Sequence, residues 1–175
     1  MIETDRLVLR PLTLDDAGMM LELLNDPDFL RYIGDRGVRT LADAREYILK
    51  GPMEMYAQRG FGPYLVERKA DGAALGICGL IKRDFLVDVD LGFAFLPAYR
   101  SQGYAYESSV AVLAHAREAL RMRRLVALVD PDNGRSAGLL ERLGFHPEGT
   151  VRFPGEEKDV LQFAVDLLDP ASSQY

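Results

Sequence analysis

One segment constrains the fold most, because in it a strand passes into a helix through a short loop of small residues. Residues 87–96 predict a long strand, and residues 104–120 predict a helix whose apolar positions repeat every 3.6 residues. Between them runs Arg-Ser-Gln-Gly-Tyr-Ala, residues 100–105. Since the first N–H groups of a helix have no intrahelical partners, this junction predicts an anion site. By spacing alone, an ordinary helix-entry turn fits the segment equally well.

The two hydrophobic periods alternate along the rest of the chain. Thr13 with Asp16, and Thr40 with Asp43, have the spacing of capping boxes and each predict the start of a helix. Asn133 predicts the cap of a further helix that stops at Gly144. Strands are predicted at residues 6–10, 64–68, 75–81, 125–129 and 159–167. This order predicts a mixed α/β (α+β) domain around a central sheet.

Length, composition and charge narrow the class of protein. A chain of 175 residues suits one domain, which we place at residues 1–169, with a frayed tail at residues 170–175. A hydrophobic content of 48% with 27% charged residues is typical of a soluble globular protein. The net charge of −6 argues against a nucleic-acid partner and fits, weakly, a cationic partner such as an amine.

The expected compartment is the cytoplasm, with no membrane partner. The single cysteine, Cys78, excludes an internal disulfide framework and fits a reducing environment. The first residues have no apolar signal-peptide core, and no apolar run reaches the roughly 20 residues that a membrane helix needs. His115 and His146 do not have a metal-ligand spacing, so we expect no metal site.

Several motifs in order resemble those of the GNAT superfamily of acetyl-CoA-dependent N-acetyltransferases. The sequence Arg-x-x-Gly-x-Ala at residues 100–105 resembles the superfamily's pyrophosphate-binding motif. Four further segments resemble the branch that acetylates ribosomal-protein N-termini: residues 4–11 its first strand, residues 25–32 its helix junction, residues 90–93 its Glu-x-Gly-aromatic strand, and residues 133–145 its last helix with the strand that follows. The resemblance spans residues 4–167.

The resemblance implies a GNAT fold, with a mixed sheet of about six to seven strands flanked by about four helices. Two neighbouring parallel strands splay apart in that fold, here those ending near Leu96 and Val129, and the pantetheine arm of acetyl-CoA lies in the gap. The backbone from Phe93 through Phe95 to Leu96 would pair with the pantetheine amides like an added strand. The pyrophosphate would be held by the N–H groups of Gln102, Gly103, Tyr104 and Ala105. The Arg100 guanidinium either assists a phosphate or is a solvated surface group.

The chemistry of amine acetylation assigns the remaining roles. An ammonium group cannot attack a thioester, so a base must remove its proton, directly or through water. Asp90 matches the position of a frequent family glutamate and is our candidate for the base; the alternative is a solvent-facing or salt-bridged carboxylate. A backbone N–H near Phe95 would stabilise the oxyanion. Glu107 matches another family glutamate, for which we expect a structural role near the start of the helix.

The general acid is the weak point of the resemblance. Many superfamily members place a tyrosine seven residues after the asparagine, and here that position is Leu140, which has no proton to give. Ser136 is the nearest substitute, and its alternative role is that of an ordinary first-turn serine. Asn133 either hydrogen-bonds the pantetheine, caps its helix, or does both with different atoms.

We therefore expect an N-acetyltransferase that passes an acetyl group from acetyl-CoA to a primary amine by direct attack. Leu140 motivates one alternative, a non-catalytic acyl-CoA-binding sensor, and a transferase for a bulkier acyl group such as succinyl is another. The acceptor is left open among a ribosomal-protein N-terminus, an antibiotic, a polyamine and a free amino acid. Residues 28–61 are expected to shape the acceptor site. A homodimer is common in such families, and the oligomeric state is left open.

Overall fold

The computed structural model describes residues 1–167, so the tail expected at residues 170–175 lies outside the described residues. The strands are β1 (Ile2–Glu3), β2 (Leu7–Pro11), β3 (Pro63–Arg68), β4 (Ala74–Ile81), β5 (Asp90–Phe95), β6 (Arg124–Val129), β7 (His146–Arg152) and β8 (Asp159–Asp166). The helices are α1 (Ala17–Leu24), α2 (Pro27–Tyr32), α3 (Leu41–Ile48), α4 (Glu54–Arg59), α5 (Tyr104–Glu118) and α6 (Gly134–Arg142). Short turns of 3-10 or π helix occupy Leu14–Asp16, Leu49–Met53 and Pro97–Tyr99.

All the strands form one mixed sheet in the order β1-β2-β3-β4-β5-β6-β8-β7. Every neighbouring pair is antiparallel except β5 and β6, which run parallel. Their register holds at a single pair, Asp90 opposite Val126, and beyond it the two strands separate. The expected mixed sheet with a splayed parallel pair is therefore confirmed, with eight strands in place of six to seven.

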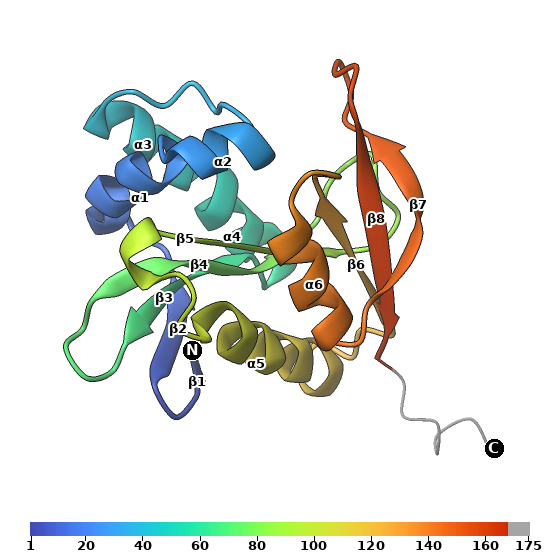
Figure 1. Cartoon of the computed structure of the whole chain (residues 1–175). Helices are drawn as coiled ribbons and strands as arrows, with labels where there is room; N and C mark the ends of the chain where they lie inside the picture. The colour runs from blue at the N-terminus through green and yellow to red at the C-terminus, as the bar shows by residue number, and fades with distance from the viewer. Residues whose placement is uncertain (168–175) are drawn as a thin grey trace.

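Helices cover both faces of the sheet, and each face has its own hydrophobic core. In Figure 1, α5 lies below the sheet, whereas α1, α2 and α3 lie above its left-hand half. Leu65 and Val66 show how the alternation of a strand divides its side chains, because Leu65 packs with the N-terminal helices and Val66 packs on the α5 side. Both are fully buried, so β3 is covered on both faces.

Both expected capping boxes are present. Thr40 Oγ1 accepts a hydrogen bond from Asp43 N (3.0 Å), and Asp43 Oδ2 accepts one from Thr40 N (3.1 Å), so α3 begins where the sequence predicted. The box formed by Thr13 and Asp16 opens a 3-10 turn, and α1 follows that turn directly. The local side-chain chemistry thus fixes both helix starts.

Four elements differ from the expectation. The strand expected at residues 87–96 is confined to Asp90–Phe95, and Val87 is 94% exposed in the loop before it. Helices α2 and α4 were not predicted, because six residues are too few to display a 3.6-residue period. Strand β1 has only two residues and is formed by pairing with β2.

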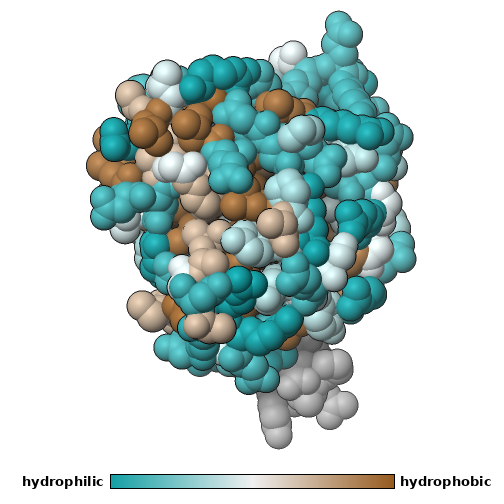
Figure 2. Space-filling view, turned by 60° about the vertical axis from the view of Figure 1, so that its left-hand side comes forward, coloured by the Kyte–Doolittle hydropathy of each residue, from teal (hydrophilic) through white to brown (hydrophobic). Residues whose placement is uncertain are grey.

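The surface carries hydrophobic side chains mainly on the N-terminal helices. Figure 2 shows them gathered at the upper left, where this helical layer faces the viewer. The exposed large ones from this part of the chain are Leu14, Leu30, Ile33, Leu41 and Leu49. No helix within residues 1–167 combines the length and the apolar character needed to cross a bilayer.

Candidate functional site

A cleft with a volume of about 650 Å³ lies where β5 and β6 separate. Its walls come from the two splayed strands, the first turns of α5 and α6, helix α2 and the loop between β7 and β8. All the site residues predicted from the sequence line this cleft except Leu96 and Gln102. The tertiary structure thus brings together residues that are up to 46 positions apart, from Asp90 to Ser136.

The inner edge of β5 has main-chain groups directed into the cleft. Leu96 N donates to Leu75 O on the β4 side (2.9 Å), so the alternation of the strand directs the main-chain groups of Phe93 and Phe95 toward the gap. Leu96 O accepts from Tyr99 N (3.0 Å). Both main-chain groups of Leu96 are thus engaged with the protein, and its buried side chain packs in the core under the N-terminal helices and does not line the cleft, which corrects the expectation for this residue.

The loop before α5 presents a row of free N–H donors. Ser101 (φ 61°) and Gly103 (φ 83°) both adopt the left-handed conformation, which turns successive N–H groups toward one side. Nothing within residues 1–167 accepts a hydrogen bond from the N–H groups of Gln102, Gly103, Tyr104 or Ala105. These donors, together with the N-terminus of the 15-residue helix α5, fit a pyrophosphate.

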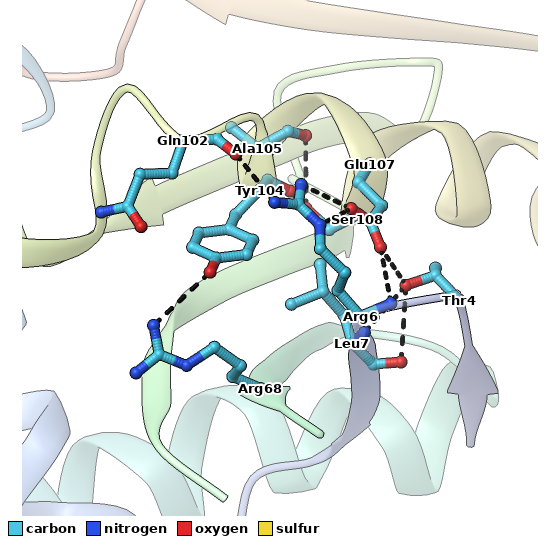
Figure 3. A network of polar contacts seen from close by, with 9 residues as sticks. All are labelled: Thr4, Arg6, Leu7, Arg68, Gln102, Tyr104, Ala105, Glu107 and Ser108. Atoms are coloured by element: carbon cyan, nitrogen blue, oxygen red, sulfur yellow. Dashed lines mark hydrogen bonds and ion pairs between the residues drawn. The ribbon is translucent and has the colours of Figure 1, made fainter. Parts of the chain in front are cut away.

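A charged clamp from the N-terminus of the chain holds this loop in place (Figure 3). The Glu107 carboxylate accepts hydrogen bonds from Thr4 Oγ1 (2.7 Å), Arg6 N (3.0 Å) and Arg6 Nε (2.6 Å). Arg6 Nη1 in turn donates to Gln102 O (3.1 Å), and the guanidinium lies 4.4 Å from the centre of the Tyr104 ring. Glu107 thus has the structural role expected of it, through the turn between β1 and β2 as well as through the helix start.

Arg100 directs its guanidinium toward acidic groups. Its Nε donates to Phe95 O (2.9 Å), Nη1 to Asp28 Oδ2 (2.8 Å) and Nη2 to Asp26 Oδ2 (2.5 Å). Asp26 is buried at the start of α2, so Arg100 ties that helix to the end of β5. All three contacts are with protein oxygens, and a phosphate contact of this side chain stays a prediction.

Asp90, the candidate base, is 2% exposed and lines the narrow end of the cleft. Its Oδ2 accepts a hydrogen bond from Arg83 Nε (2.5 Å), and Arg83 also lies 5.1 Å from the centre of the Phe153 ring. Burial raises the pKa of Asp90 above its ordinary value, although the charge and hydrogen bond of Arg83 oppose this. The carboxylate is therefore salt-bridged, as in the alternative role considered for it above. Its raised pKa also suits a proton acceptor.

The start of α6 supplies the opposite wall. Asn133 Oδ1 accepts from Ser136 N (3.2 Å), which confirms that Asn133 caps this helix. The Ser136 hydroxyl is half-buried and has no hydrogen-bond partner within residues 1–167. Leu140, at the position where many family members have a tyrosine, is 1% exposed and belongs to the core beside the cleft. This position therefore offers no proton donor.

Two charged features of the cleft were not predicted from the sequence. Asp130 is 6% exposed at the carboxyl end of β6 and pairs with Lys158 Nζ (2.6 Å) from the β7–β8 loop. Arg135 reaches from α6 to the phosphate loop, where its Nη2 donates to Ser101 Oγ. The sequence held a signal for Asp130, since polar residues at the carboxyl ends of parallel strands often line sites. Arg135 stands between Asn133 and Ser136 in the sequence, but no role in the site was predicted for it.

Comparisons with known proteins agree with the geometry. The sequence profile of the acetyltransferase (GNAT) domain matches residues 6–146. The chain is 28% identical over 154 residues to the uncharacterized N-acetyltransferase YoaA of Bacillus subtilis, covering 86% of this chain and 85% of that protein.

Two solved structures share the fold. The ribosomal-protein-S5-alanine acetyltransferase of Vibrio fischeri has a TM-score of 0.77 at 18% identity, covering 95% of this chain and 96% of that one. The spermidine N-acetyltransferase of Vibrio cholerae, solved in complex with CoA and spermine, has a TM-score of 0.77 at 18% identity, covering 94% and 97%. The domain match covers most of the chain and includes the phosphate loop and the splayed strands, and the chain belongs to the GNAT acetyltransferase family.

Proposed function

We propose that this protein transfers the acetyl group of acetyl-CoA to a primary amine by direct attack, in the cleft between β5 and β6. The observation that carries the proposal is the row of N–H donors from Gln102 to Ala105 at the start of α5, held open by the clamp of Arg6 and Glu107. A pyrophosphate is the ligand that suits such a row beside a gap between strands. The spermidine N-acetyltransferase of Vibrio cholerae, which shares the fold, was solved with CoA bound, and this agrees with the choice of ligand.

The bound thioester would lie along the inner edge of β5. The N–H group of Phe95 faces the gap and is therefore available to the oxyanion of the tetrahedral intermediate. The carbonyl oxygen of Phe95 also faces the gap, but it already accepts a hydrogen bond from Arg100. Asp90 takes the proton of the incoming ammonium group through a water, because a short carboxylate at the base of the cleft does not reach far. The Ser136 hydroxyl, which has no protein partner within residues 1–167, donates a hydrogen bond to the leaving thiolate and relays a proton to it from solvent water, so that no alkoxide is left behind.

Calorimetric titration with acetyl-CoA tests the cofactor half of the proposal. In the Gly103→Glu variant a side chain occupies a position with φ 83°, its Cβ would lie 3.3 Å from Arg6 Nη2, and a carboxylate faces the phosphate site. We expect the native protein to bind and the variant to lose at least about a hundredfold in affinity. Gly155→Glu is the matched control, since Gly155 also has a positive φ (81°) but nothing lies within 4 Å of its added Cβ. Equal affinity of native protein and Gly103→Glu variant would refute the proposal.

A second candidate function rests on two observations at the same site. Leu140 leaves the usual acid position without a proton donor, and Asp90 is held by Arg83. A sensor that binds acyl-CoA without turnover would tolerate both. Release of CoA thiol across a broad panel of amines separates the two functions, because the sensor binds the thioester tightly and consumes none of it with any acceptor.

The compartment and the assembly state stay predictions. The single cysteine, Cys78, is fully buried and suits a reducing cytoplasm, where cell fractionation should find the protein. The oligomeric state is left open, with a homodimer common in such families, and sedimentation at micromolar concentration measures it.

A further inference from the structure

The cleft carries more positive than negative free charge, although the chain as a whole is acidic. Apart from the arginines of the phosphate loop and of α6, its basic lining residues are Arg31, Arg36, Arg83 and Lys158. Its acidic lining residues are Asp28, Asp90, Asp130 and Glu156. The charge that a substrate meets depends on which of these groups are already paired within the protein.

Most of the acidic groups are neutralised by partners. Asp90 pairs with Arg83 (2.5 Å), Asp130 with Lys158 (2.6 Å) and Asp28 with Arg100 (2.8 Å). Glu156 is the one acidic lining residue without an ion pair within residues 1–167.

Two arginines on the opposite wall are free. Neither Arg31 nor Arg36 forms an ion pair with any residue of the described chain, and both side chains are exposed to the cleft. Asp35, which stands beside Arg36, is engaged with Arg39 (2.5 Å), so it does not neutralise Arg36. Arg31 occupies the last turn of α2, where its guanidinium lies 4.8 Å from the centre of the Tyr32 ring.

The field of Arg31 reaches across the cleft. Burial raises the pKa of Asp130, but hydrogen bonds from Lys158 and from Asp132 N outweigh this, and the charges of Lys158 and Arg31 act in the same direction, so the pKa lies below its ordinary value. Arg31 is therefore close enough to act on the wall formed by β6 and the β7–β8 loop. The free positive charge therefore belongs to the same cleft that Asp90 lines.

Apolar side chains line the cleft together with these arginines. They include Phe29, Tyr47, Met55 and Ile77, from the N-terminal helices and β4. A polyamine would place further positive charges beside Arg31 and Arg36, at a cost in like-charge repulsion. An amine that also carries a carboxylate and an apolar group meets complementary charge and complementary surface.

We propose that the acceptor is a primary amine whose molecule carries a carboxylate near the amine, held by Arg31 and Arg36, in the manner of a free amino acid with an apolar side chain. This inference rests on the proposed transferase function and narrows its acceptor. The same carboxylate chemistry could come from a succinyl group on the thioester, and the test distinguishes these two sources.

The test compares L-phenylalanine with L-phenylalaninamide at saturating acetyl-CoA, with release of CoA thiol as the readout. The amide has the more easily deprotonated amine, so a preference for the acid cannot come from amine reactivity. We expect kcat/KM for the acid to exceed that for the amide by at least about tenfold, and spermidine to be the poorest acceptor. Added salt should reduce the preference, because exposed charges are screened.

Substitutions assign the preference to the two arginines. Each of Arg31→Gln and Arg36→Gln should lower the ratio of acid to amide by about three- to fivefold, and the double variant should bring it close to one. Arg45→Gln, an exposed arginine of α3 outside the cleft and without an ion pair in the described residues, is the matched control and should keep the native ratio. Affinity for acetyl-CoA should be unchanged in all of these variants.

The outcomes separate this inference from the function on which it rests. Failure of the native protein to bind acetyl-CoA refutes the proposed function. If the protein binds acetyl-CoA and turns over but prefers the amide or spermidine, only the acceptor assignment is refuted. A preference for succinyl-CoA over acetyl-CoA that depends on Arg31 and Arg36 also refutes only the acceptor assignment. If neither phenylalanine probe is turned over, calorimetry with N-acetyl-phenylalanine and its amide on the CoA-saturated protein decides, and equal affinities overturn the inference.

Discussion

The clamp between Arg6 and Glu107 gives the sharpest prediction, because it ties the turn between β1 and β2 to the phosphate loop. In Glu107→Gln, the side-chain amide keeps one acceptor oxygen and replaces the other with an NH2 group. In either orientation of the amide, this NH2 group faces a donor of Arg6 or Thr4 and a hydrogen bond is lost. A hydrogen bond to a charged group contributes about 1.5 to 3 kcal/mol. The Arg6 side chain is 47% exposed and that of Glu107 20%, so solvent screening reduces the expected loss to about 1 to 2 kcal/mol.

Thermal unfolding followed by circular dichroism measures this loss at pH 7. For a chain of this length it corresponds to a fall in Tm of about 3 to 6 °C. The Kd of acetyl-CoA should also rise, by about three- to tenfold, since Arg6 would no longer be fixed against Gln102 O. Glu118→Gln is the control, because Glu118 lies on the same helix, is 67% exposed and, among residues 1–167, pairs only with its neighbour Arg117.

The pH dependence supplies an independent check. Burial raises the pKa of Glu107, but hydrogen bonds from Thr4 and Arg6 outweigh it and hold the pKa below its ordinary value. A carboxyl group with a lowered pKa stabilises the fold above its unfolded pKa and loses that contribution as the pH falls through its folded pKa. The difference in stability between native protein and Glu107→Gln should therefore narrow below about pH 4. A Tm for Glu107→Gln within 1 °C of that for Glu118→Gln, with unchanged affinity, would refute the role given to the clamp.

Three further predictions follow from the same geometry. Asp90→Asn should lower kcat by about 10²- to 10³-fold with the Kd of acetyl-CoA unchanged, and an unaltered kcat would remove this residue from the mechanism. In the native protein, a pH–rate profile should show activity falling as the pH drops through the raised pKa of Asp90. Gly76→Ala should cost about 3 kcal/mol in urea unfolding, because the new Cβ would lie 2.2 Å from a β5 carbonyl oxygen. Gly18→Ala, whose new Cβ meets no atom of residues 1–167 within 4 Å, should instead stabilise the protein by up to about 1 kcal/mol, because Gly18 lies in helix α1. Arg100→Ala leaves the buried Asp26 unpaired and should cost about 2 to 3 kcal/mol by the same measurement, and a loss no larger than that of an exposed arginine would contradict it.

Features that depend on neighbours in the sequence could be predicted from it. The capping box at Thr40, the cap at Asn133 and the glycine loop before α5 each involve residues within a few positions of one another, and each is present. The order of strands and helices also follows from hydrophobic periods, which report burial of one face of each element. Short elements such as α4 were missed because one or two turns carry too little of that period.

The tertiary structure alone decided which charged groups are free and which are paired. Asp90 was identified as a carboxylate in a strand, but its burial and its bond to Arg83 depend on how a loop returns over the sheet. Glu107 meets Arg6 across 101 positions, and Arg100 meets the carboxylates of α2 across more than 70. Such pairs leave no periodic trace in the sequence, since a pairing energy depends on distance in space.

The anion loop at residues 100–105 shows both sides of this division. Its glycine, its position after a strand and its place at the start of a helix were determined by the sequence, because backbone conformation and helix ends are local properties. The opening of β5 from β6 and the turning of Arg100 away from the loop were decided only by packing, since both require elements far apart in the chain to meet.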